Sequence, residues 1–83
     1  MPSILKATSV AVDINAGANT VSDSTLVSVI NTTASATQVV DQATGNNIYI
    51  GAGERVFIEK ASDSDLIAPD AGPVWASAVA YKA

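Results

Sequence analysis

Apolar and polar residues alternate along most of this chain in short runs, a pattern typical of β-strands. Four of these runs are rich in β-branched residues and follow one another in the middle of the chain, at Thr25–Ile30, Thr37–Val40, Asn47–Ile50 and Arg55–Ile58. Polar breaks with turn residues separate the later runs, at 43–46 and 51–53. Strands this short, at this spacing, predict an antiparallel β-meander over residues 20–60.

Two further extended segments flank the meander. The first covers residues 3–14 and predicts an edge strand that is half-buried at its far end, because four apolar residues share one parity: Ile4, Val10, Val12 and Ile14. The second covers residues 74–81 and has two unequal faces. One face carries small residues suited to close packing against another layer, and the other carries Trp75, Val79 and Tyr81.

The fold class follows from these runs. No segment has helical periodicity, no internal repeat is present, and no linker divides the chain, so residues 1–83 are expected to form a single β-domain. We predict an all-β fold, a small antiparallel β-sandwich or partly open barrel of six to seven short strands built around the β-meander. The large apolar residues expected in its core are Ile30, Val40, Ile48, Ile50, Phe57 and Trp75.

The second hairpin of the meander allows a register to be predicted. A three-residue loop at 43–45, with Gly45 in the left-handed conformation, places Val40 opposite Ile48 and Val39 opposite Tyr49. The side that carries Val40 and Ile48 holds more aliphatic surface and is assigned to the core. The Val39–Tyr49 side is then expected to face solvent or a neighbouring subunit.

The amino-acid composition adds a reason to expect that other protein subunits contact this domain. Charged residues make up 14% of the 83-residue chain, against about 25% in an average domain. A domain of this size has a narrow stability margin, and with Cys 0 and His 0 it has neither disulfides nor the ligands of a structural zinc site. Two interpretations fit: a small β-domain with a Ser/Thr-rich surface, or a domain whose outside is largely covered by other subunits.

The charge pattern and the residue types also exclude several function classes. The net charge is −4 with only four Lys and Arg residues, so we expect no nucleic-acid binding. No apolar run approaches the length of a membrane span, and the first residues lack the pattern of a signal peptide. Without His or Cys, the usual Ser-His and Cys nucleophile systems are excluded, and no cofactor is expected.

Three weaker signals favour structural roles. The acidic residues Asp63, Asp65 and Asp70 fit a solvated loop better than a calcium site, because Leu66 and Ile67 interrupt the ligand spacing. The Asp13–Gly17 segment matches a cation loop over too few residues to predict one. A sugar-binding platform formed by Trp75 and Tyr81 is possible, but core anchoring explains aromatic residues in so small a domain more simply.

Five segments carry a family resemblance: Ser3–Val10, Thr25–Asn31, Gly53–Lys60, Asp63–Leu66 and Val74–Tyr81. Through them the chain resembles the small virion structural proteins of marine tailed phages, particularly cyanophages. Such proteins are encoded among head and tail genes and are built into the particle. The resemblance implies no active site and transfers no site residues.

The resemblance and the low charge content lead to one functional hypothesis. We expect a non-enzymatic structural subunit of a phage virion, foremost a capsid decoration or cement protein that stabilises contacts between shell subunits. Its partners would be the major capsid protein or other virion subunits, in a homo-oligomer or many-copy assembly, after synthesis in the host cytoplasm. The alternatives are a neck, tail or baseplate subunit, or a module that binds a host-surface glycan or protein. The candidate interface residues are Val39, Tyr49 and Leu5.

Overall fold

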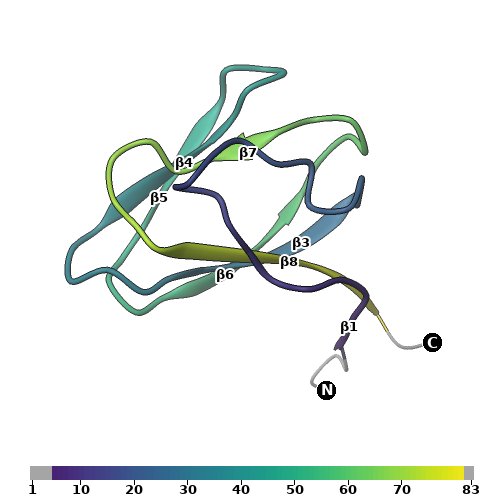
Figure 1. The fold of residues 1–83 in the computed structure, drawn as a ribbon, viewed down its shortest axis with the longest axis horizontal. Helices are drawn as coiled ribbons and strands as arrows, with labels where there is room; N and C mark the ends of the chain where they lie inside the picture. The colour runs from purple at the N-terminus through teal and green to yellow at the C-terminus, as the bar shows by residue number, and fades with distance from the viewer. Residues whose placement is uncertain (1–4, 82–83) are drawn as a thin grey trace.

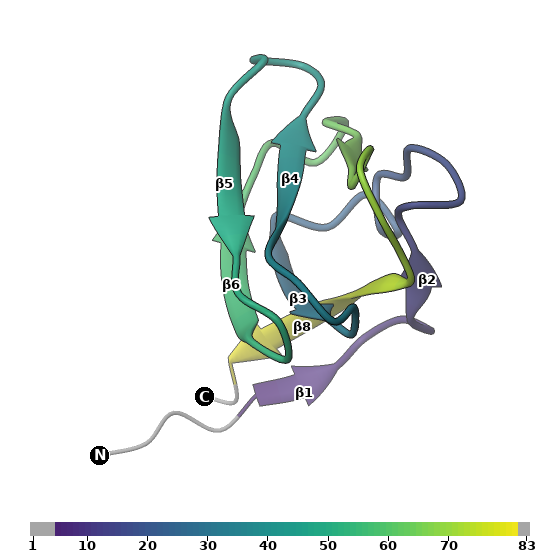
Figure 2. The same ribbon diagram turned by 90° about the vertical axis from the view of Figure 1, so that its left-hand side faces the viewer.

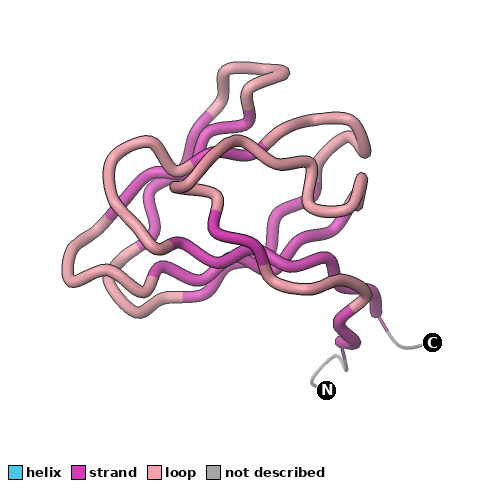
Figure 3. Tube along the Cα trace, in the orientation of Figure 1, coloured by secondary structure: helices cyan, strands magenta, loops and turns pink. Residues whose placement is uncertain are grey.

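A computed structural model describes residues 5–81 of the chain, which form two antiparallel β-sheets stacked face to face (Figure 1). The five-stranded sheet contains β1 (Leu5–Ala7), β2 (Val12–Asp13), β3 (Leu26–Asn31), β6 (Arg55–Glu59) and β8 (Val74–Tyr81). The three-stranded sheet contains β4 (Thr37–Asp41), β5 (Asn47–Ile50) and β7 (Leu66–Ile67). Only strands and loops occur over these residues (Figure 3). The predicted all-β sandwich is therefore confirmed, with two-residue strands β2 and β7 added to six longer ones.

The order of the strands differs from the predicted meander. In the larger sheet the order is β1-β8-β3-β6, with β2 also paired to β8, and in the smaller sheet it is β5-β4-β7. Of the four central runs, only β4 and β5 form a hairpin, because the chain changes sheet between β3 and β4 and again between β5 and β6. The meander prediction is wrong for a physical reason. Each run has an apolar face, and stacking two sheets buries these faces against each other.

The core lies between the sheets and consists mainly of small and β-branched side chains. The larger sheet contributes Val27, Val29, Val74, Ala76 and Ala78, all at most 3% exposed. The smaller sheet contributes Val39, Ile50 and Leu66, and the connecting segments add Ile14, Val21 and Ala68. The prediction that residues 74–81 pack a small-residue face against another layer is thus confirmed for Val74, Ala76 and Ala78.

Most of the large residues predicted for the core lie elsewhere. Of the six, only Ile50 is buried, while Ile30 and Val40 are half-buried. Ile48, Phe57 and Trp75 are exposed, at 44%, 49% and 41%. Because side chains alternate between the faces of a strand, the inward position of Val74 and Ala76 forces Trp75 outward.

The β4–β5 hairpin differs from its predicted register by one residue. Val39 lies opposite Ile48, and Val40 lies opposite Asn47. Asp41 causes the change: its carboxylate accepts a hydrogen bond from the Ala43 backbone at 3.0 Å, and its carbonyl accepts one from Gly45 at 2.7 Å. These contacts extend the loop to residues 42–45. Gly45 does adopt the predicted positive φ, 77°.

The two long sides of the sandwich are closed to different degrees. On one side the backbones of Asn19 and Leu66 exchange hydrogen bonds of 3.1 and 2.9 Å, and Ala68 donates to the Ile14 carbonyl at 3.0 Å. The Asn15 side chain also donates to the Ala68 carbonyl, at 2.8 Å. On the other side, β5 and β6 are the outermost strands of their sheets (Figure 2) and do not pair with each other. The sandwich is therefore joined along the β2–β7 side and open along the β5–β6 side.

Candidate functional site

The outward face of the larger sheet, over β3, β6 and β8, carries two exposed aromatic side chains, Trp75 and Phe57. We call it the outer face and define it by the outward-pointing residues of these strands. The first row across the sheet contains Trp75, Ile30 and Arg55, and the second contains Ser77, Ser28 and Phe57. Glu59 and Leu26 form the third pair. Side chains directly opposite one another on one face lie within contact range, so these residues form one continuous surface.

The middle of the outer face is fixed by an arginine. The Arg55 guanidinium donates a 2.7 Å hydrogen bond to the Ser28 hydroxyl, which lies on the neighbouring strand. Ser28 is only 3% exposed although it points away from the core. The long stem of Arg55 thus covers the small serine. The aromatic rings of Phe57 and Trp75 remain 49% and 41% exposed.

The surroundings of Trp75 indicate the kind of contact that it suits. Its neighbours across the strands are Ile30 on β3 and Asp13 on β2. The Asp13 carboxylate already accepts hydrogen bonds from the backbones of Asn15, at 2.9 Å, and Val74, at 3.1 Å. A sugar platform needs polar groups beside its aromatic ring, and here one oxygen of the nearest carboxylate, Asp13 Oδ1, is engaged by both of these backbone N–H groups. The apolar Ile30 side chain beside the indole favours contact with a protein surface.

The residues predicted as interface are not brought together. Val39 is 2% exposed and belongs to the core, so its assignment to a contact face was wrong; the shifted hairpin register moved it inward. Tyr49 is 68% exposed on the outward side of the smaller sheet. Leu5 pairs with Tyr81 through the backbone of β1 and β8, but the side chains of both lie outside the described residues. The proposed Trp75–Tyr81 platform therefore stays a prediction.

Two of the three acidic loop residues make contacts with the smaller sheet or its hairpin loop. Asp70 accepts a 3.1 Å hydrogen bond from the Gln38 side chain, and the Asp65 carbonyl accepts one from the Gln42 backbone at 2.9 Å. Asp63 is exposed. Within residues 5–81, no three His, Cys, Asp or Glu side chains are grouped closely enough to hold a metal ion. The same residues contain no helix long and apolar enough to cross a membrane.

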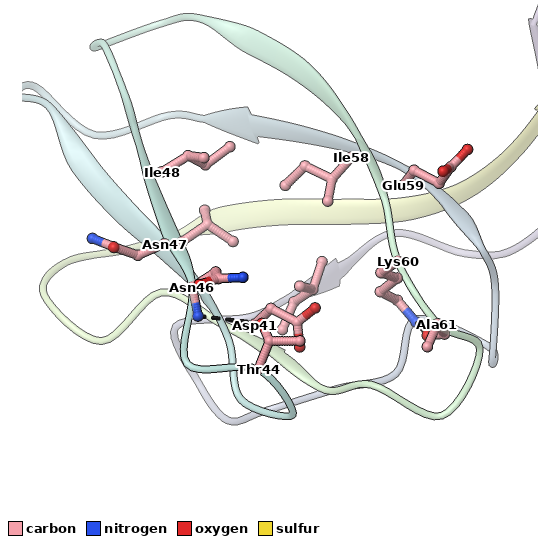
Figure 4. A pocket seen from close by; sticks show the side chains of 11 residues that line it. Asp41, Thr44, Asn46, Asn47, Ile48, Ile58, Glu59, Lys60 and Ala61 are labelled. Carbon is pink, nitrogen blue, oxygen red and sulfur yellow. Dashed lines mark hydrogen bonds between the residues drawn. The ribbon is translucent and has the colours of Figure 1, made fainter.

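A cleft of about 550 Å³ opens on the unpaired side of the sandwich (Figure 4). Ile48 of β5 and Ile58 of β6 point toward each other across it. The buried core residues Val39 and Leu66 also line it. Polar residues complete the lining: Asp41, Thr44, Asn46, Asn47, Glu59 and Lys60. This volume lies within the range of binding pockets. The cleft exists because β5 and β6 belong to different sheets and nothing in the described chain bridges them.

Lys60 lies in this cleft and is only 6% exposed. Its ammonium group donates to the carbonyl oxygens of Ala61, at 3.1 Å, and Ser62, at 3.4 Å. Both acceptors belong to the loop that follows β6. An ammonium group has three N–H donors, so these two contacts leave capacity for one more acceptor.

The outer face was missed because the aromatic residues were assigned to the core on size alone. The alternation within residues 74–81 contained the necessary signal, since a face of Val74, Ala76 and Ala78 directed inward requires Trp75 outside. The cleft had no comparable signal, because it depends on two sheet changes that strand patterns do not specify. No protein-family model, no curated protein and no solved structure matches this chain.

Proposed function

We propose that this protein is a non-enzymatic structural subunit of a phage particle, most simply a capsid decoration or cement protein, and that its outer face binds neighbouring shell subunits. The observation that carries the proposal is the exposure of Trp75 and Phe57 on one sheet face of a chain with 14% charged residues. Exposed aromatic residues are enriched at the centre of protein interfaces, and arginine, which here lies beside Phe57, is enriched there too. The phage assignment itself rests on the resemblance described above.

The composition of the outer face supports a role in binding neighbouring shell subunits. It offers two exposed aromatic side chains, Trp75 on β8 and Phe57 on β6. Arg55, also on β6, has its guanidinium held by Ser28. Tryptophan and arginine are enriched among the residues that dominate binding energy. A rigid sheet also loses little conformational entropy when it docks, which favours repeated contacts in a large shell.

A module that binds a host-surface protein or glycan is the second candidate, favoured by the same exposed indole. The two candidates differ in what surrounds Trp75. Ile30 on one side offers no hydrogen bond to a sugar, and on the other side one oxygen of the Asp13 carboxylate is already engaged by two backbone N–H groups. We therefore rank protein contact above glycan contact for this face.

The proposal is tested by adding purified protein back to particles that lack it. Wild-type protein should bind saturably, and Trp75→Ser should weaken binding at least tenfold while the protein stays folded. Tyr49→Ser removes an aromatic ring from the opposite sheet and should bind as wild type. Loss in Tyr49→Ser with full binding by Trp75→Ser would instead place the contact on the smaller sheet. No binding by wild-type protein would contradict the decoration role.

A further inference from the structure

We propose that β6 pairs with β6 of a second copy of this chain, antiparallel and about a two-fold axis at Phe57, so that the larger sheets of two copies become one continuous sheet. This inference goes beyond the proposed function and is independent of it, because it concerns contacts between copies of the protein alone. It rests on the free edge of β6, on the order of the charges along this strand, and on the apolar residues between them.

One edge of β6 offers unpaired backbone groups. Within residues 5–81, β6 pairs only with β3 and is the outermost strand of its sheet (Figure 2). The Lys60 backbone donates to the Thr25 carbonyl at 2.9 Å. Because hydrogen-bonded residues alternate along an antiparallel ladder, the N–H and C=O groups of Arg55, Phe57 and Glu59 point away from β3. Such an edge accepts another strand.

The charges along this strand complement those of the same strand run in reverse. Residues 54–60 read Glu-Arg-Val-Phe-Ile-Glu-Lys. A two-fold axis at Phe57 places Arg55 opposite Glu59 of the second copy, and the glutamate that begins this segment falls opposite the lysine that ends it. Opposite charges directly across an antiparallel pair are favourable, and like charges are unfavourable. An axis moved by one residue in either direction loses both matches, so the charges select this register.

The central charged residues are free to meet across the axis. Arg55 and Glu59 are exposed. The Arg55 guanidinium donates one hydrogen bond, of 2.7 Å, to the Ser28 hydroxyl. A guanidinium has five N–H donors, so others remain for a carboxylate of the second copy. The ammonium group of Lys60 is buried and donates to backbone carbonyls, so the outer match contributes its sign and not a direct contact.

Apolar residues fill the space between the charges on both sides of the strand. Phe57, 49% exposed on the outer face, meets its own counterpart at the axis, and aromatic pairs across strands are stabilising. On the inward side, Val56 falls opposite Ile58 of the second copy, and both side chains are half-buried. Ile58 also lines the cleft. The added strand therefore covers apolar surface above and below the sheet.

The second free edge of the sandwich, that of β5, offers no such match. Asn47–Ile50 contains no charged residue, so no charge in its sequence selects a register with a second copy. Pairing at β5 is the alternative that the experiments separate from pairing at β6.

Exchange of charges between copies tests the register in sedimentation experiments. Wild type should dimerise with rising concentration. Arg55→Glu and Glu59→Arg each place like charges opposite one another, and each should weaken dimerisation roughly tenfold or more. An equal mixture of the two variants restores opposite charges at both positions and should dimerise about as tightly as wild type. Asp70→Arg, the same charge reversal in the loop between β7 and β8, is the matched control and should behave as wild type.

Two outcomes of this experiment would overturn the proposal. One is a wild-type protein that stays monomeric at millimolar concentration. The other is a mixture that associates no more tightly than its separate variants while each remains folded by circular dichroism.

Introduced cysteines give a second measurement, because the chain has Cys 0. Only a residue on the two-fold axis faces its own counterpart, at a Cα separation that a disulfide can span. Phe57→Cys should therefore form a disulfide dimer under mild oxidation roughly tenfold faster than Arg55→Cys. Tyr49→Cys, exposed on β5, reports pairing at the other edge. Equal rates for Phe57→Cys and Arg55→Cys, or a faster reaction of Tyr49→Cys, would contradict the proposal. Neither measurement involves particles, so its failure is distinct from failure of the proposed function.

Discussion

The side chain of Asn31 donates a 3.0 Å hydrogen bond to the carbonyl oxygen of Ile50, and this contact joins the two places where the chain changes sheet. The same amide group donates to the carbonyls of Ser35, at 2.9 Å, and Gly51, at 3.2 Å. Its oxygen accepts from the backbone and hydroxyl of Thr33, at 2.9 and 2.6 Å. Asn31 is 0% exposed. The buried Asn31 side chain thus holds together the two segments in which the chain passes from one sheet to the other.

Replacing Asn31 should therefore destabilise the fold. Asn31→Ala leaves several backbone groups without their partner, and we expect a loss of about 2–3 kcal/mol in the free energy of unfolding. Chemical denaturation monitored by circular dichroism measures this. Asn31→Asp keeps the shape but points a carboxylate at three carbonyls, so its loss should be larger at pH 7 than at pH 4. A change below about 0.5 kcal/mol in Asn31→Ala would contradict this role.

Replacing Gly45 should destabilise the fold because of the backbone conformation of this residue alone. Its φ is 77°, and a Cβ at this position would meet no atom within 4 Å. Gly45→Val should cost about 1–2 kcal/mol, since the left-handed region is unfavourable for residues with a side chain. Gly17 is the matched control, with equal space and no positive φ. Gly17→Ala should be neutral or slightly stabilising, and equal losses at the two sites would contradict this explanation.

Thr37 offers a stabilising substitution. Its hydroxyl is buried without a hydrogen-bond partner among the described residues, and the side chain is 1% exposed. Valine has nearly the same shape and removes the polar atom. Thr37→Val should raise the free energy of unfolding by about 1 kcal/mol. A lower melting temperature in this variant would show that the hydroxyl has a partner.

Replacing Trp75 should weaken binding more than it lowers the stability of the fold. Because the indole is 41% exposed, Trp75→Ala should cost less than the ~3–5 kcal/mol expected for a fully buried tryptophan. Leu66, at 1% exposure, is the core reference, and Leu66→Ala should cost about 2–5 kcal/mol. Thermal melting of the two variants compares them. A larger loss in Trp75→Ala than in Leu66→Ala would mean that the indole supports the fold.

The sequence predicted the strands better than their arrangement. Alternation within each run identified the strands and the inward face of Val74, Ala76 and Ala78. It gave no information on which strands pair, because the sheet change after β3 depends on the contacts of Asn31 with residues 4 to 20 positions later. The register of the hairpin was wrong by one residue because the Asp41 contacts lengthened the loop. Residue size was a poor guide to burial, because strand alternation places Trp75 and Phe57 on the outward face.

We propose that the outer face of the larger sheet is the surface by which this protein is built into a particle. A reconstruction of purified particles by electron cryomicroscopy at side-chain resolution tests it most directly. The account predicts many copies of the sandwich, with Trp75 and Phe57 covered by a neighbouring shell subunit. Copies whose outer face is turned to solvent, or particles that lack the protein, would contradict it.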